Sequence, residues 1–310
     1  MIRSHPRADA PWTGATWIDL CDATDEERAA VAKATGLRVP TKEAISEIET
    51  TSRTFTENHA IYLSTPLPAA VKAAQPLTAV GFVLTQSVLL TVRFGANGVF
   101  DSVFEACTGE AHLPACDVFL RLLEALVDRS ADALEHASSE LDTISQHAFH
   151  ADGVHKKPSN ALRQGLRKLG QMGDWSSQIR DTLLGLGRMA AFVSETGGEA
   201  LLDKQQTPRL KAVRADILSL NDYQLHLSGK VQFLLDATLG FISIEQNDIV
   251  KTLTIVSVVG VPPVLIAGIY GMNFHFMPEL GWHYGYPFAL LLMAVTGLAP
   301  LLWFKWRGWM

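Results

Sequence analysis

Two charge-free runs near the C-terminal end constrain the fold of this chain more than any other feature. Residues 253–269 and 286–304 contain no Asp, Glu, Lys or Arg. Each run has about the length of helix that crosses a hydrocarbon core roughly 30 Å thick, at a rise of about 1.5 Å per residue. Only a short linker separates the runs, so they predict a transmembrane helical hairpin whose loop reaches one membrane face.

The first run leads into the sequence Tyr270-Gly271-Met272-Asn273. Asn273 differs from the Leu and Val residues before it, because it brings an amide oxygen to the end of a membrane helix. The simplest interpretation is a polar selector at the entrance of a pore. The structural alternative is a helix C-cap, a position at which Asn is common.

The charges that flank the two runs predict their orientation. Lys251 precedes the first run, Lys305 and Arg307 follow the second, and the loop between them has no Lys or Arg. Since positive residues favour the cytoplasmic side, both termini and residues 1–250 are expected in the cytoplasm. The N-terminus lacks the apolar core of a signal peptide.

Composition supports a cytoplasmic location for the first 250 residues and argues against one class of partner. The three cysteines have no metal-ligand spacing, which favours a reducing compartment. Net charge is −6 and no basic stripe is present, so no nucleic-acid partner is expected.

The remaining chain changes character at about residue 114. Before it, short strands are expected near residues 16–20, 54–67 and 77–92; after it, apolar residues recur at helical spacing, and one helix is expected from about 208 to 270. The expected segments are a cytoplasmic α/β domain (1–115), a cytoplasmic helical hairpin (116–207), a stalk helix (208–251), a pore-lining transmembrane helix (252–273), an outer loop (274–285), a second transmembrane helix (286–304) and a basic cytoplasmic tail (305–310).

Steps of three and four residues define one face along the stalk and the first span. The face contains Asp236, Leu239, Ser243, Gln246, Val250, Leu253, Ser257, Val261, Val264 and Gly268, and Asp222 lies two heptads earlier. If several copies pack around an axis on this face, the lining is small or apolar in the membrane and acidic below it. Val250, Leu253 and Val261 are then candidates for a hydrophobic gate. The alternative is a face that is buried against neighbouring helices.

Four short stretches carry a family resemblance. They are Tyr270-Gly271-Met272-Asn273-Phe274, Met277-Pro278-Glu279-Leu280, Gly285-Tyr286-Pro287 and Trp303-Phe304-Lys305-Trp306-Arg307. In this order, and with the approach over residues 240–247, they resemble the CorA family of magnesium channels. The resemblance is nearly continuous from about residue 225 to 310 and rests on element order and short pieces further upstream.

The resemblance implies an α+β fold and a funnel-shaped homopentamer. Each subunit is expected to give a cytoplasmic α/β/α domain, a long stalk helix that lines the pore, and a two-helix transmembrane hairpin. The implied protein is not an enzyme and has no organic cofactor. It is expected to be a channel of the inner (plasma) membrane that mediates Mg²⁺ influx, which the membrane potential drives. Co²⁺ and Ni²⁺ are the further ions that such a channel would carry.

The resemblance also assigns site residues. Asn273 matches the Asn whose five copies hold a hydrated cation at the outer entrance, with Gly271 and Met272 in the same filter turn. Glu279 is expected at the outer mouth, with a solvated loop carboxylate as the alternative.

Regulation transfers less directly. In the family, cytoplasmic Mg²⁺ closes the pore by bridging acidic residues of neighbouring subunits, and one such stalk position falls on Ala212 here. Asp216, Asp222 and Asp236 are therefore the candidate regulatory metal ligands, with solvated carboxylates as the alternative.

Two other functions compete. A Zn²⁺ transporter of the same superfamily usually has Gly-Val-Asn at its mouth, and the nearest histidines here, His147, His150 and His155, form no zinc motif. A non-transporting membrane scaffold is the second alternative. The sequence contains neither a phosphate-binding loop nor a nucleophile elbow that would support catalysis. Only Cys107 and Cys116, with His112, suggest a nucleophile.

Overall fold

The computed structural model describes residues 1–6, 12–47, 49, 53–68, 77–110, 113–149, 158–273, 275 and 277–309. The chain divides into two compact units. Unit 1 comprises Met1–Lys156 and Arg163–Leu235, and unit 2 comprises Lys157–Leu162 and Asp236–Met310.

Unit 1 contains a six-stranded sheet of order β1-β2-β6-β5-β4-β3. Its strands are β1 (Ile2–His5), β2 (Trp17–Cys21), β3 (Thr54–Glu57), β4 (Ala60–Pro68), β5 (Leu77–Leu84) and β6 (Leu89–Arg93). β2 and β6 pair in parallel, and the other neighbours are antiparallel. The strands expected near residues 16–20, 54–67 and 77–92 are confirmed, whereas β1 at the sheet edge was not expected.

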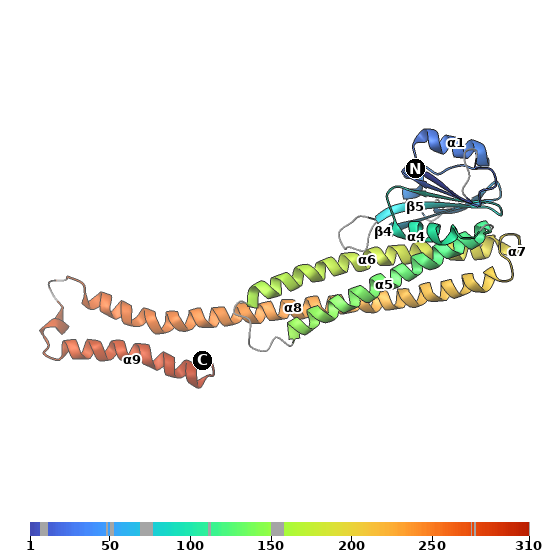
Figure 1. The fold of residues 1–310 in the computed structure, drawn as a ribbon. Coiled ribbons are helices and arrows are strands. Elements are labelled where there is room, and N and C mark those ends of the chain that lie inside the picture. The colour runs from blue at the N-terminus through green and yellow to red at the C-terminus, as the bar shows by residue number, and fades with distance from the viewer. Residues whose placement is uncertain are drawn as a thin grey trace. The chain divides into compact units, whose positions relative to one another are not determined.

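Helices cover both faces of this sheet, as Figure 1 shows. On one face α4 (Gly98–Cys107) and α5 (Ala115–Phe149) bury Trp17, Phe82 and Phe119 in a single apolar core. On the other face α1 (Asp25–Thr35) packs through Val31 against strand residues that include Leu90, and α2 (Lys42–Ser46) lies over β4 and β5. The expected α/β/α arrangement is therefore confirmed.

Helix α4 corrects the expectation that helices resume only at about residue 114. The Asn97 side chain caps it by accepting a hydrogen bond from the Val99 amide at 3.1 Å. Phe100, Val103 and Cys107 are buried at helical spacing. The cap and this spacing were the available signals, but a helix of ten residues offers few turns over which periodicity can be recognised.

The helical part of unit 1 consists of α5, α6 (Pro158–Thr196), the short α7 (Gly198–Leu201) and the first part of α8 (Gln206–Tyr270). α5, α6 and α8 share a second apolar core that includes Leu134, Leu183 and Leu227. At the start of α8, Arg209 donates two hydrogen bonds to the Glu124 carboxylate on α5, at 3.0 and 2.8 Å. The expected helix from about 208 to 270 is confirmed with a start two residues earlier.

Unit 2 contains the rest of α8, a 3-10 turn η1 (Pro278–Gly281) and α9 (Gly285–Trp306). α9 returns beside the C-terminal part of α8 (Figure 1). The two helices approach at Gly297, where an added Cβ would lie 3.5 Å from Cγ of Pro263 and 3.7 Å from the Val259 carbonyl oxygen. Within the described residues, α8 and α9 are the two helices long and apolar enough to cross a membrane.

Candidate functional site

The membrane end of α8 closes in a tight turn. The Gly271 amide donates to the Ala267 carbonyl at 2.9 Å, and the Met272 amide donates to the Ile269 carbonyl at 3.2 Å. A Cβ at position 271 would lie only 3.1 Å from the Ala267 oxygen, so glycine suits this turn. The turn brings the chain out of the helix directly before Asn273.

Asn273 is exposed, and its amide forms no hydrogen bond within the part of the chain that the structure describes. Its backbone is not in the left-handed region, which non-glycine residues occupy only at Trp12, Asp22, Asn58 and His59 among the described positions. Asn273 therefore lacks the left-handed conformation of a helix-terminating residue. Its side chain is exposed, so an ion or its water can reach the amide oxygen.

The face expected to line a pore is exposed within unit 2. Val250, Leu253, Val261 and Val264 are 59–71% exposed, and Ser257 and Gly268 are exposed too. In the second half of the first span this face lies away from α9. Pro263 marks the side of α8 that α9 contacts, and at about 100° per residue Val261, Val264 and Gly268 lie roughly 100–160° around the helix from it. An exposed apolar face on a membrane helix can contact lipid or another copy of the chain.

Residues of α8 that belong to unit 1 also form an exposed series. Leu218 and Leu225 are 68% and 56% exposed, whereas Val213, Ile217 and Leu227 on the other side are buried against α5 and α6. We call the exposed series Leu218, Asp222, Leu225, Asp236 and Leu239 the stalk stripe. Leu218 and Leu225 were not expected to belong to it, although they lie three and two heptads before Leu239, so stepping back from Leu239 by sevens would have found them.

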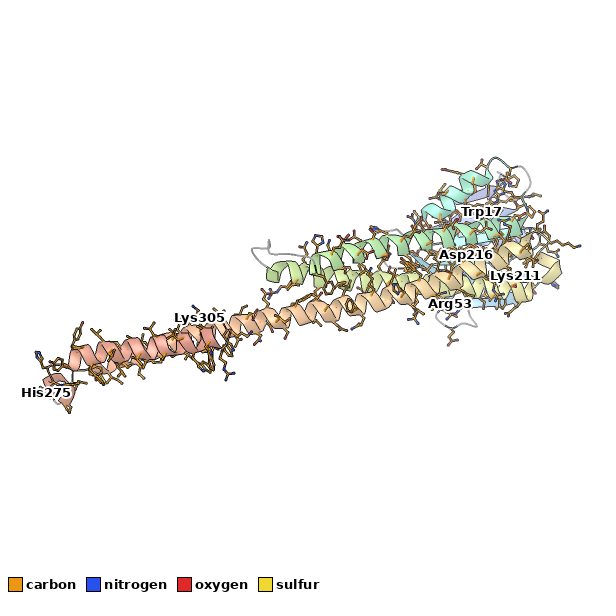
Figure 2. The ribbon with its side chains drawn as sticks, turned by 90° about the horizontal axis from the view of Figure 1, so that it is seen from below. Trp17, Arg53, Lys211, Asp216, His275 and Lys305 are labelled. Carbon is orange, nitrogen blue, oxygen red and sulfur yellow. The ribbon has the colours of Figure 1, made fainter. Side chains whose placement is uncertain are left out.

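The three candidate regulatory acids do not lie together. Asp222 and Asp236 are on the stalk stripe, while Asp216, labelled in Figure 2, lies about 120° around the helix from Asp222. Ala212, the position indicated by the family, is exposed and has no ligand atom in its side chain. No group of three His, Cys, Asp or Glu side chains within the described residues could hold a metal.

The outer loop carries aromatic contacts and an exposed imidazole. Trp282 packs against Tyr284 and Phe288, with ring centroids 6.3 and 5.7 Å apart, and His283 lies edge-on to Tyr284 at 5.2 Å. His275 is exposed. The side chain of Glu279 lies outside the described residues, so its expected place at the outer mouth stays a prediction.

The buried thiols are poor nucleophiles. Burial raises the pKa of Cys107, and burial raises the pKa of Cys116 to about 12. Both thiols are therefore protonated near neutral pH, whereas a nucleophilic cysteine needs its thiolate. His112 lies outside the described residues, as do His150 and His155 of the suggested histidine group; His147 contacts the Thr143 carbonyl at 2.7 Å.

Comparisons with known proteins agree with this architecture. The family described as CorA-like Mg²⁺ transporter protein matches residues 12–306. The magnesium transport protein CorA of Pasteurella multocida (strain Pm70) is 32% identical over 314 residues, covering 100% of this chain and 96% of that protein.

Solved structures show the same fold. The CorA magnesium transporter of Methanocaldococcus jannaschii has a TM-score of 0.75 at 19% identity, covering 95% of this chain and 91% of that chain. The cytoplasmic domain of ZntB from Vibrio parahaemolyticus is less similar, with a TM-score of 0.50 at 10% identity over 73% of this chain and 87% of that chain. Because the family match spans nearly the whole chain and a 32% identical relative covers all of it, this protein belongs to the CorA-like Mg²⁺ transporter family.

Proposed function

We propose that this protein is a homopentameric channel of the inner (plasma) membrane that mediates Mg²⁺ influx. The observation that carries the proposal is Asn273, an exposed amide without a described hydrogen bond at the end of a membrane helix. In a fivefold assembly around the exposed face of α8, the five Asn273 amide oxygens surround the outer end of the pore.

The filter selects a hydrated ion. Mg²⁺ binds oxygen and releases its water reluctantly, so neutral acceptors that contact the water shell are suited to it. Five amides also avoid the deep trap that five carboxylates would form. Gly271 allows the tight turn beneath this ring, and Met272, 46% exposed, braces the same turn.

Below the filter the ion passes a mostly apolar lining. Gly268, Val264, Val261, Ser257, Leu253 and Val250 follow one another toward the cytoplasm on the exposed face of α8. An apolar constriction can gate a pore by losing its water. Val250, Leu253 or Val261 forms this gate in our proposal.

The membrane potential supplies the driving force. One elementary charge gains about 2.3 kcal/mol per 100 mV, so a divalent ion gains about 4.6 kcal/mol. With both termini in the cytoplasm, the filter faces outward, and an inside-negative potential draws Mg²⁺ inward. A ring of Glu279 carboxylates at the outer mouth concentrates cations there.

Cytoplasmic Mg²⁺ closes the channel through stalk carboxylates. Asp222 and Asp236 lie on the stalk stripe and therefore face the fivefold axis in the pentamer, while Asp216 lies off the stripe, toward a neighbouring subunit. Since no described group within one copy could hold a metal, such a site requires carboxylates from more than one subunit.

Two alternatives remain testable. Transport of Zn²⁺ instead of Mg²⁺ is favoured only by the weaker likeness to the ZntB domain, and Co²⁺ and Ni²⁺ are further ions to compare. A membrane scaffold without transport would explain the two spans but gives no role to the exposed amide of Asn273.

Ion uptake into proteoliposomes under an inside-negative potential tests the proposal. We expect Mg²⁺ influx in the wild type and its loss in Asn273→Ala. The matched control is Asn221→Ala, which removes the same side chain from the stalk, where Asn221 only donates to the Ile217 carbonyl at 3.0 Å. Zn²⁺ influx with little Mg²⁺ influx would support the zinc alternative, and no flux from folded pentamers would support the scaffold.

A further inference from the structure

His275 lies two residues beyond Asn273 in the loop that joins the two membrane helices. Figure 2 shows it at the loop end of the hairpin formed by α8 and α9. Its imidazole is exposed and makes no hydrogen bond, ion pair or ring contact with any other described residue. His283, the other imidazole of the loop, is instead packed against Tyr284.

The short chain distance keeps His275 close to the proposed filter. Two residues of extended chain span at most about 7 Å, so each imidazole is attached within that distance of an Asn273 backbone. In a fivefold assembly the pore mouth therefore carries five His275 side chains just outside the ring of amides. Within one copy no group of three described ligand residues could hold a metal, so a site here would be built by neighbouring copies.

Imidazole distinguishes two classes of divalent cation. Mg²⁺ prefers oxygen ligands and keeps its water, whereas Co²⁺, Ni²⁺ and Zn²⁺ bind imidazole nitrogen well. An imidazole that is exposed and has no contact among the described residues can present a nitrogen lone pair to such an ion. A ring of imidazoles thus retains transition-metal ions that a ring of amides alone would let pass.

We propose that His275 residues of neighbouring subunits form an outer site for Ni²⁺, Co²⁺ and Zn²⁺, which blocks Mg²⁺ entry when it is occupied. This inference rests on the pentameric channel proposed above. The site lies outside the Asn273 ring, so its removal leaves the filter in place. It determines which ions inhibit the channel and is not required for Mg²⁺ passage.

The test combines inhibition and direct binding. In proteoliposomes, the Ni²⁺ concentration that halves Mg²⁺ influx is measured for the wild type, His275→Ala and the control His283→Ala. All measurements are made at one fixed pH. Ni²⁺ binding to the same purified proteins is measured by calorimetry, which does not depend on transport.

We expect His275→Ala to keep Mg²⁺ influx, to raise the half-inhibitory Ni²⁺ concentration roughly ten- to hundredfold, and to lose the tightest Ni²⁺ binding step. His283→Ala is expected to match the wild type in both measurements. Equal inhibition and equal binding in His275→Ala and the wild type would overturn the site while leaving the channel proposal intact. If the wild type carries no Mg²⁺, the channel proposal fails, and the calorimetric comparison by itself decides whether His275 binds the metal.

Discussion

Replacing Gly185 with alanine tests how tightly α6 is held against the sheet. Gly185 lies within α6, where alanine normally stabilises a helix by about 1 kcal/mol relative to glycine. Here the added Cβ would overlap Oγ1 of Thr65 on β4 and lie only 3.0 Å from Cβ of Thr65 and 3.3 Å from Cδ of Pro66. Thr65 is 1% exposed, so it has no free space into which to move.

The expected magnitude follows from these opposing terms. Forcing extra atoms into a packed interface costs about 1–3 kcal/mol, and the overlap with a fully buried side chain indicates the upper end. A second contact resists adjustment, because Thr182, one turn earlier on α6, donates to the Pro66 carbonyl at 3.1 Å. Subtracting the helix gain leaves a net loss of about 2 kcal/mol, which lowers the unfolding temperature by roughly 4–8 °C.

The assay is thermal unfolding of the full-length detergent-solubilised protein, followed by circular dichroism. Gly170→Ala is the matched control, since Gly170 is an exposed position of the same helix with no atom within 4 Å of the added Cβ. It should be as stable as the wild type or up to about 1 kcal/mol more stable. Adding Thr65→Ala should restore part of the stability lost in Gly185→Ala. Unfolding of Gly185→Ala at the same temperature as Gly170→Ala would contradict the close packing of α6 on β4 at Gly185.

Three further predictions concern stability. Asp19→Asn should cost about 3 kcal/mol in the same thermal assay, because it removes the buried carboxylate that Arg3 and the 3% exposed Arg93 share and leaves Arg93 paired with Asp101. A change below about 1 kcal/mol would contradict this. Only a Cβ fits at position 297 beside Pro263. Gly297→Leu should therefore reduce the fraction of protein that elutes as an oligomer in size-exclusion chromatography, whereas Gly297→Ala should not. Equal elution of the two variants would contradict the close approach of α9 to α8. Burial raises the pKa of Cys116 to about 12, so above about pH 8.5 the unfolded thiol loses a proton that the folded thiol keeps. The free energy of unfolding should therefore fall as pH rises, by up to about 1.4 kcal/mol per pH unit. Cys116→Ala should show a shallower decline.

Local features of the chain were sufficient to predict several elements. The two spans follow from length and absence of charge, and the strands from short runs of β-favouring residues, so neither requires knowledge of a distant contact. The Gly-Met-Asn turn was equally visible in the sequence, and its position after a span is the basis of the prediction that Asn273 is the filter residue. The parallel pairing of β2 with β6 was not predictable in this way, because it joins segments about 70 residues apart that are equally compatible with other partners.

The sequence also predicted part of the candidate site and left the rest open. A heptad count predicted which face of α8 lines a pore within the membrane. Val261 and Val264 on this face are exposed, and their place in a pore stays a prediction. Regulation could not be assigned in this way, since a carboxylate on a helix can be solvated, paired or shared with another copy. The tertiary structure separates Asp216 from Asp222 by their direction around the helix.

The stalk shows most clearly what only the tertiary structure decided. Leucine is generally buried more often than glutamine, yet in the structure Leu225 is 56% exposed and the adjacent Gln224 is 2% exposed. Gln224 is buried because its amide donates to Oγ of Ser176 on α6 at 3.0 Å and to Oγ of Ser228 at 2.8 Å. A buried donor is tolerated where acceptors satisfy it, as they do for this NH₂ group, whereas Oε1 of Gln224 has no hydrogen-bond partner among the described residues. The sequence by itself determined that α8 is a helix with apolar residues on more than one side, while the position of α6 decided which of those sides is buried.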